Sequence, residues 1–246
     1  MNGNKITVLG HGGMGSRHTY PINCFESIYY SLGLASDGVE MDMQMTLDSV
    51  MVAMHDRDLS QLTDVSGEIS SLNWEQIEGA TYSDPLYTNY RISSSEQVLE
   101  GIAYEFDKKI YLDLKSYTPH ISETERKRYC NALLRLIDKY NIENRVMVEI
   151  DNAELIMTLK SMRPAVSIFV RSDFENALEL SNIYDLNGIS IAVDKITAEQ
   201  VAKAHAQGRM VAVYDAETEA KNIEAIEKSV DIIIADKLKH LIRILK

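Results

Sequence analysis

The sequence has few of the features that mark secreted, membrane-spanning or nucleic-acid-binding proteins. Its two cysteines, Cys24 and Cys130, are too few for a disulfide framework, and neither lies in a CxxC or Cys/His cluster. Basic residues number 25 against 37 acidic ones, and the net charge of −12 repels nucleic acid and anionic membranes. No apolar run is long enough to cross a bilayer, and the first residues do not resemble a signal peptide. We therefore expect a small-molecule partner, no transmembrane segment and a cytoplasmic location, or export if a signal peptide has been removed.

What is present indicates a folded α/β protein. Hydrophobic residues make up 45% and charged residues 25% of the 246 residues, which is typical of a globular domain. Apolar, often β-branched runs alternate with helical patterns that open on capping boxes, such as Ser94 to Gln97, Ser122 to Glu125 and Thr197 to Gln200. This alternation, at a length near the roughly 250 residues of such folds, predicts one domain over residues 1–246, a TIM (β/α)8 barrel. The candidate strands are residues 6–10, 38–44, 50–55, 110–115, 145–150, 167–171, 188–193, 210–214 and 231–236.

Two features depart from a regular barrel. Nine candidate strands are one more than the eight required, and we expect the irregularity at the closely spaced runs 38–44 and 50–55. The segment 57–93 interrupts the alternation and is predicted to be a small insertion between the early strands. Within it Trp74 is expected to pack into the body from a short helix, and three tyrosines are candidates to line a substrate entrance: Tyr82, Tyr87 and Tyr90.

Polar residues end almost every candidate strand. In a parallel barrel the carboxyl ends of the strands share one rim, which is where catalytic residues gather. The simpler explanation, that strands end in polar loops anyway, accounts for some of them. The sequence thus predicts a polar mouth that includes His11, His55, Lys115, Asp151, Arg171, Asp194, Asp215 and Asp236.

Glu40 and Asp42 lie two residues apart on a candidate strand, so their side chains share one face, with Met41 and Met43 on the other. Inside a barrel such a pair suffers repulsion and desolvation unless a cation neutralises it. We therefore predict a metal site here. The alternative is a solvated edge strand with both acids in water.

Asp113 and Lys115 repeat this spacing on another strand and add a third acid and a cation. Carboxylate oxygens suit a hard ion, so Mg²⁺ or Ca²⁺ is favoured over zinc. A structural Asp–Lys ion pair is the competing interpretation.

His11 follows the first candidate strand and His55 ends the third, so both are expected at the same rim. A histidine pair beside a metal suits general acid and base chemistry, because either protonation state is available near neutral pH. Three carboxylates, one divalent ion and Lys115 sum to zero charge, so one protonated histidine would balance a phosphodiester. Taken singly, each histidine could be an ordinary hydrogen-bonded residue.

These residues lie in a stretch that resembles the glycerophosphodiester phosphodiesterase family. Residues 33–59, GLASDGVEMDMQMTLDSVMVAMHDRDL, are similar to the family signature, in which G-A-D-x-[IV]-E-x-D is followed by T-x-D and a V-x-H-D step. The likeness continues through Leu59, Thr63 and Gly67, through DLK at the E-x-K position, and to IIIAD near the end. It implies a TIM barrel that uses a divalent metal to hydrolyse glycerophosphodiesters to glycerol 3-phosphate and an alcohol. By resemblance the catalytic histidines are His11 and His55, the metal ligands are Glu40, Asp42 and Asp113, and Lys115 contacts phosphate.

The sequence also departs from the family pattern. Gly12 stands where an Arg usually follows the first histidine, and Ile22 stands for the Glu of Pro-Glu-Asn-Thr. Arg17 or Arg171 is a candidate to supply the missing guanidinium. Asp113 replaces Glu, as in the related sphingomyelinase D enzymes, and Glu149, where the family commonly has Ser, is a candidate to offset its shorter reach. Tyr214 replaces a frequent Trp, and Gln61 a usual Arg.

Three functions follow from these observations. The first is metal-dependent hydrolysis of a small glycerophosphodiester. The second, suggested by the D-x-K form, is phospholipase D-like cleavage of a lysophospholipid. The third, suggested by Gly12 and Ile22, is a phosphodiester-binding protein with weakened turnover.

Overall fold

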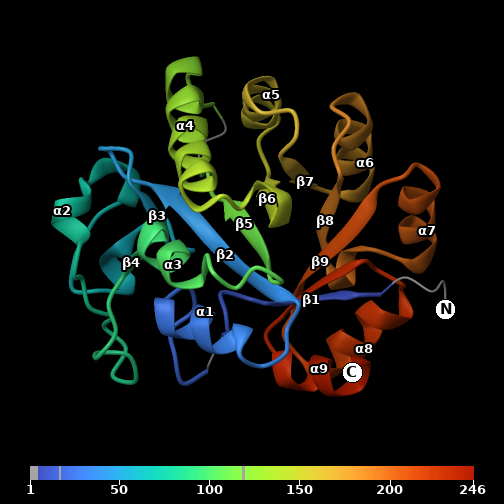
Figure 1. Ribbon diagram of the computed structural model, residues 1–246, viewed down its shortest axis with the longest axis horizontal. Coiled ribbons are helices and arrows are strands. Elements are labelled where there is room, and N and C mark those ends of the chain that lie inside the picture. Colours follow the sequence, from blue (N-terminus) through green and yellow to red (C-terminus); the bar gives the residue numbers. More distant parts are fainter. Residues whose placement is uncertain (1–4, 17, 118–119) are drawn as a thin grey trace.

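The computed structural model describes residues 5–16, 18–117 and 120–246, and within them the chain forms a closed barrel of eight parallel strands (Figure 1). The first strand pairs with both the second and the last, which closes the sheet. The predicted TIM barrel is therefore confirmed. The barrel strands are β1 (Thr7–Gly10), β2 (Gly38–Met45), β5 (Lys109–Leu114), β6 (Val146–Ile150), β7 (Ser167–Arg171), β8 (Gly188–Ala192), β9 (Met210–Ala216) and β10 (Ile232–Ala235).

The surplus predicted strand, residues 50–55, does not belong to the barrel. It is the short β3 (Met51–Ala53), which runs antiparallel to β2 and pairs in turn with the antiparallel β4 (Ser93–Ser94). The irregularity expected between the first two closely spaced runs is confirmed. A hairpin connection is too short for a parallel crossover, so the second of these runs has to fold back on the first.

Helices surround the barrel, and the predicted capping boxes begin three of them. In each box the cap side chain accepts from the backbone three residues on, which satisfies an amide that the first helical turn leaves free. The surrounding helices are α1 (Phe25–Leu32), α3 (Ser95–Ile102), α4 (Glu123–Tyr140), α5 (Ala153–Met162), α6 (Phe174–Ile183), α7 (Ala198–Ala206), α8 (Glu219–Glu227) and α9 (Leu238–Leu245). None of the described helices is long and apolar enough to cross a membrane.

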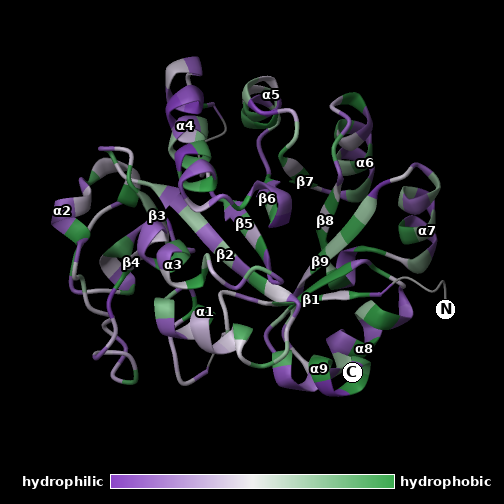
Figure 2. Cartoon of the chain, viewed as in Figure 1, coloured by the Kyte–Doolittle hydropathy of each residue, from purple (hydrophilic) through white to green (hydrophobic). Residues whose placement is uncertain are grey.

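The core has an outer and an inner part because strand side chains alternate. Met41 and Met43 belong to the large cluster between strands and helices. The inner cluster includes Leu9, Tyr111 and Phe169, contributed by three different strands. Figure 2 shows hydrophilic residues running through β2, whereas β8 and β9 are mainly hydrophobic. Among these strands, hydrophilic residues are therefore concentrated on β2 (Figure 2).

A small insertion fills the connection between β3 and β4 and lies beside β2 and β3 at one side of the barrel (Figure 1). It has its own buried cluster, formed by residues such as Met54, Leu59 and Tyr82. Trp74 packs against this cluster from the start of a single helical turn, as expected. Its short helices are η1 (Leu59–Gln61), η2 (Ile69–Ser71) and α2 (Trp74–Ile77).

Candidate active site

Four charged side chains are buried at the carboxyl ends of β2 and β5. Glu40, Asp42, Asp113 and Lys115 are 3%, 2%, 6% and 6% exposed. Glu40 pairs in register with Tyr111 of the inner cluster, and Asp42 pairs with Asp113, so these acids face the barrel interior. The alternative of a solvated edge strand is thereby excluded.

Lys115 is the cation nearest to two of these acids. Its Nζ lies 3.0 Å from Oδ1 of Asp42 and 2.5 Å from Oδ2 of Asp113. Burial opposes the charge of Lys115, but the carboxylates of Asp113 and Asp42 outweigh it and raise its pKa. Burial likewise opposes ionisation of Asp42, yet the positive charge of Lys115 and the two histidines lowers its pKa. The pair Asp42 and Lys115 is thus charged on both sides.

The negative charges of the other two acids, Glu40 and Asp113, are not fully balanced by cations of the protein. Burial and the charge of Asp42 raise the pKa of Glu40 to about 8, although its Oε2 accepts a 2.8 Å hydrogen bond from the amide of Gly12. Burial also raises the pKa of Asp113, whose Oδ1 is buried and has no hydrogen-bond partner among the described residues. A buried acceptor without a donor has the character of an oxygen that binds a cation.

A possible metal cluster is formed by donor atoms of His11, Glu40 and Asp42, which all lie within 4.8 Å of one another. Two buried carboxylates and the free oxygen of Asp113 next to them suit a hard divalent ion. The residues present therefore fit the metal implied by the sequence, but the cluster consists of His11 with Glu40 and Asp42 and does not include the predicted ligand Asp113.

His11 is held by Asp236, a residue that follows the last barrel strand. Its Nδ1 lies 2.6 Å from Oδ1 of Asp236, which also accepts from the amide of Ser16 at 3.1 Å, while the Ser16 hydroxyl donates to Oδ2 at 2.5 Å. Burial works to lower the pKa of His11, but the hydrogen bond to Asp236 and the charges of Glu40 and Asp236 raise it to about 10. Asp236 was expected at the rim by its strand-end position, but nothing in the sequence assigned it to His11, which is 225 positions away.

Asn23 is a site residue that the sequence reasoning missed. Its Nδ2 donates to Oδ2 of Asp42 at 2.7 Å, and its Oδ1 accepts from the Asp42 amide at 3.0 Å. The backbone of Asn23 has a φ of 65°, in the left-handed region that Asn tolerates better than most residues. The signal was available, because Asn23 retains the Asn of the Pro-Glu-Asn-Thr pattern.

Arg171 lies between acids rather than in an open position. Its guanidinium contacts Asp113 at 3.2 Å, Glu149 at 3.4 Å and Asp151 at 3.1 Å. Glu149 also accepts from the Tyr111 hydroxyl at 2.9 Å, and burial together with the charge of Asp113 raises the pKa of Glu149 to about 7. The structure thus places Arg171 and Glu149 directly beside the Asp113–Lys115 pair.

The other predicted site residues lie at the edge of this cluster or outside it. His55 follows β3 with a side chain 51% exposed, and its Nδ1 lies 2.7 Å from Oδ1 of Asp56. Tyr214 packs partly buried against the inner cluster. Arg17 lies outside the described residues.

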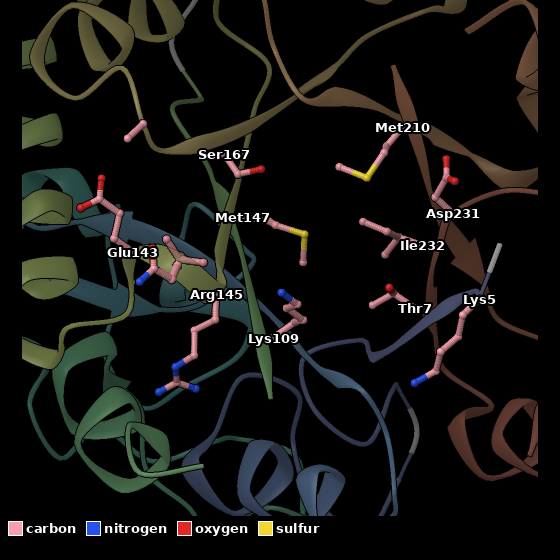
Figure 3. Close-up of a pocket in the computed structure, with 13 residues that line it drawn as sticks. Lys5, Thr7, Lys109, Glu143, Arg145, Met147, Ser167, Met210, Asp231 and Ile232 are labelled. Carbon is pink, nitrogen blue, oxygen red and sulfur yellow. The ribbon is translucent and has the colours of Figure 1, made fainter. Parts of the chain in front are cut away.

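Cavities open at both ends of the barrel. One of about 470 Å³ includes His55 in its lining, and one of about 240 Å³ includes Lys115. A third, of about 630 Å³, lies at the opposite end, where Figure 3 shows residues from the starts of the strands, such as Thr7, Lys109 and Ile232. The buried acids thus lie at the end with the first two cavities.

Comparison with known proteins identifies the family. The model of the glycerophosphoryl diester phosphodiesterase family matches residues 11–240. A glycerophosphodiester phosphodiesterase of Caldanaerobacter subterraneus is 26% identical over 168 residues, which are 67% of this chain and 65% of that protein. The chain therefore matches slightly less than two thirds of that relative's length.

Solved structures share the fold. A glycerophosphodiester phosphodiesterase from Parabacteroides distasonis has a TM-score of 0.85 at 17% identity, with 98% of this chain and 97% of that chain covered. A phosphodiesterase from Oleispira antarctica, solved with its product sn-glycerol-3-phosphate, has a TM-score of 0.85 at 18% identity, with 96% and 95% covered. At these identities the likeness establishes the barrel alone.

Proposed function

Because the chain belongs to the glycerophosphoryl diester phosphodiesterase family, whose members are phosphoric diester hydrolases, we propose that it hydrolyses glycerophosphodiesters to glycerol 3-phosphate and an alcohol. The observation that carries this proposal is the buried cluster of Glu40, Asp42 and Asp113 against Lys115, in which one carboxylate oxygen lacks a donor among the described residues. The glycerol 3-phosphate product of the Oleispira antarctica protein supports the same reaction.

Glu40, Asp42 and Asp113 would hold a divalent cation, Mg²⁺ or Ca²⁺. When bound, this ion supplies Lewis acidity towards a phosphoryl oxygen. His11 also reaches the cluster, but we assign it to proton transfer, because its Nδ1 is held by Asp236 at 2.6 Å and this hydrogen bond raises its pKa, which favours a ring that can donate a proton. The same charge helps to balance the anionic diester.

The protein side chains then divide the remaining work. Lys115 supplies positive charge for the phosphate, and Arg171, anchored by three carboxylates, supplies a second cation. Water attacks phosphorus, the bond from phosphorus to the alcohol oxygen breaks, and the two histidines take the proton from water and give one to that oxygen. Asp236 and Asp56 lie on Nδ1 of His11 and His55, which fixes the ring orientation and leaves Nε2 of each for the substrate.

The test is release of glycerol 3-phosphate from a panel of glycerophosphodiesters, with Mg²⁺, Ca²⁺ or a chelator. We expect no turnover with chelator and a loss of about 10²- to 10⁴-fold in His11→Ala and in His55→Ala, the range for removing a general acid or base. His120→Ala, on an exposed histidine, is the matched control and should retain full activity. Full activity in chelator, or in His11→Ala, would contradict the proposal.

The two other functions are outcomes of the same assay. A cyclic phosphate detected by ³¹P NMR would favour phospholipase D-like cleavage over hydrolysis. Gly12 has no side chain to contact the phosphate, and only its backbone amide contacts Glu40. This observation keeps a phosphodiester-binding protein with weakened turnover as a candidate function. Binding of a diester without any turnover would support it.

A further inference from the structure

The cavity of about 470 Å³ lies between the first loop of the barrel and the insertion. One wall comes from Pro21 and Ile22, the opposite wall from Leu62, Tyr82 and Tyr87, and the part between them from Met54 to Asp56. Because the two walls come from loops rather than from barrel strands, their residues can vary without disturbing the fold.

This cavity adjoins the proposed catalytic groups. His55 lines it directly. Ser16 also lines it, and the Ser16 hydroxyl binds Asp236, which in turn holds His11. A group bound in this cavity would therefore lie beside the residues that move protons.

The neighbouring cavity of about 240 Å³ has the opposite charge character. Its lining includes three cations, Arg57, Lys115 and Arg128, against one acid, Glu125. The larger cavity is lined by two carboxylates, those of Asp56 and Asp84, and by no Lys or Arg among the residues that the structure describes. The linings of the two cavities are in contact, because the Tyr117 hydroxyl, in the smaller one, donates a hydrogen bond to the backbone oxygen of His55, in the larger one.

A phosphodiester has the same polarity. Its phosphate is an anion and fits the cavity that carries Lys115. The alcohol esterified to this phosphate is then assigned to the acidic cavity. Electrostatic focusing by Asp56 and Asp84 would disfavour an anionic alcohol there and favour a cationic one.

The remaining lining of the acidic cavity is apolar and aromatic. Ile22 and Met54 present hydrocarbon, and the rings of Tyr82 and Tyr87 lie 6.3 Å apart with planes 75° from each other. Such rings attract cations through their π faces, most strongly cations whose own surface is hydrocarbon and which desolvate easily. A small, strongly hydrated ammonium would gain less from these walls.

We propose that this cavity binds the alcohol moiety of the substrate and favours alcohols that end in a quaternary ammonium group over neutral or anionic alcohols of the same size. The inference rests on the proposed function, since it concerns the second product of that reaction. Asp84, Ile22 and Tyr87 are then residues that determine specificity without taking part in the chemistry.

The test compares kcat/KM for three esters of glycerol 3-phosphate: those of choline, of 3,3-dimethylbutanol and of glycerol. The second alcohol has the shape of choline but no charge, so its comparison with choline isolates the cation. We expect the choline ester to exceed the dimethylbutyl ester by about fivefold or more, which corresponds to the weaker cation–π and surface charge effects. Both should exceed the glycerol ester, because the walls are apolar.

Two variants locate the effect. Asp84→Asn should lower the choline to dimethylbutyl ratio while leaving the dimethylbutyl rate unchanged, and Asn can still accept the Leu86 amide that Asp84 binds at 2.9 Å. Asp107→Asn is the matched control, since it removes one carboxylate whose side chain is 81% exposed and does not line the cavity. Tyr87→Leu should lower the choline rate more than the dimethylbutyl rate.

Equal rates for the choline and dimethylbutyl esters in the unmodified protein would overturn the inference. So would an equal fall of the ratio in Asp84→Asn and Asp107→Asn, because the effect would then be one of net charge. Both results leave the proposed function intact. Hydrolysis of none of the three esters, in the presence of either metal, would instead refute the proposed function itself.

Discussion

Replacing Lys115 by Met tests whether the buried cluster is charge-balanced as described. Lys115 lies 3.0 Å and 2.5 Å from carboxylate oxygens of Asp42 and Asp113, and all three side chains are nearly inaccessible to solvent. At an effective dielectric constant of about 20, the 3.0 Å contact alone is worth about 5 kcal/mol of Coulomb attraction, which the desolvation of the lysine partly cancels. Removing one partner of a buried ion pair costs about 3–5 kcal/mol, because the other partner stays buried.

We therefore expect the metal-free Lys115→Met variant to unfold at a temperature about 10 °C lower than the unmodified protein, since 1 kcal/mol shifts Tm by about 2–4 °C in a domain of this size. The assay is thermal unfolding followed by circular dichroism in chelator. Added Ca²⁺ or Mg²⁺ should reduce the deficit, because a divalent ion binds the native carboxylates and stabilises the fold by mass action.

Lys109→Met is the matched control for this experiment. Lys109 begins the same strand, its side chain is exposed, and it forms no ion pair among the described residues. Its loss should change the unfolding free energy by less than about 0.5 kcal/mol. If Lys115→Met in chelator were as stable as Lys109→Met, the charge balance described for the cluster would be wrong.

Further predictions concern the residues that hold the site. In urea unfolding of the metal-free protein, Asp236→Asn should lower the unfolding free energy most between about pH 4 and 6.5. The hydrogen bond from His11 depresses the pKa of Asp236 from 3.8 to about 2, so the stability that Asp236 contributes is lost as pH falls towards 2. The pKa of His11 is raised from 6.5 to about 10, so the stability that His11 contributes is lost as pH rises towards 10. Asn23→Ala should lower the free energy of unfolding, measured by chemical denaturation, by about 1–3 kcal/mol. Two hydrogen bonds to Asp42 are lost, and alanine tolerates the φ of 65° less well than asparagine. Calorimetry should also show weaker Ca²⁺ binding. Gly13→Ala should greatly lower the yield of folded protein, as its Cβ would lie 2.3 Å from a backbone carbon of α1 at a φ of 96°.

Much of the barrel was predictable because its signals are local. Alternation on the strand that carries Glu40 and Asp42 places both carboxylates on one face, and the register of β2 with β5 then puts Asp113 beside Asp42. Capping boxes such as Ser122 to Glu125 mark helix starts, since the hydrogen bonds that define them span only three residues. The antiparallel direction of β3 was predictable from the short connection between β2 and β3, but its pairing with β4, about 40 residues later in the chain, depends on tertiary structure.

The contacts that tune the site were not predictable in the same way. His11 and Asp236 meet only because the first and last strands pair when the barrel closes. Arg171 was expected at the rim, but its contact with three carboxylates depends on side-chain reach across β5, β6 and β7. The resemblance to the Pro-Glu-Asn-Thr pattern pointed to Asn23, but its left-handed backbone and its two hydrogen bonds to Asp42 are not indicated by any local pattern of apolar and polar residues.

The overall charge of −12 and an anionic substrate are compatible because the negative charge at the site is smaller than its carboxylates suggest. Burial raises the pKa of Glu40 to about 8, which reduces its negative charge near neutral pH, while Lys115, Arg171 and His11 stay positive. A divalent ion must displace the Glu40 proton to bind, so burial links cation affinity to pH, and affinity should rise up to about pH 8. Burial of these carboxylates therefore destabilises the metal-free protein and, for the same reason, favours binding of a cation among them.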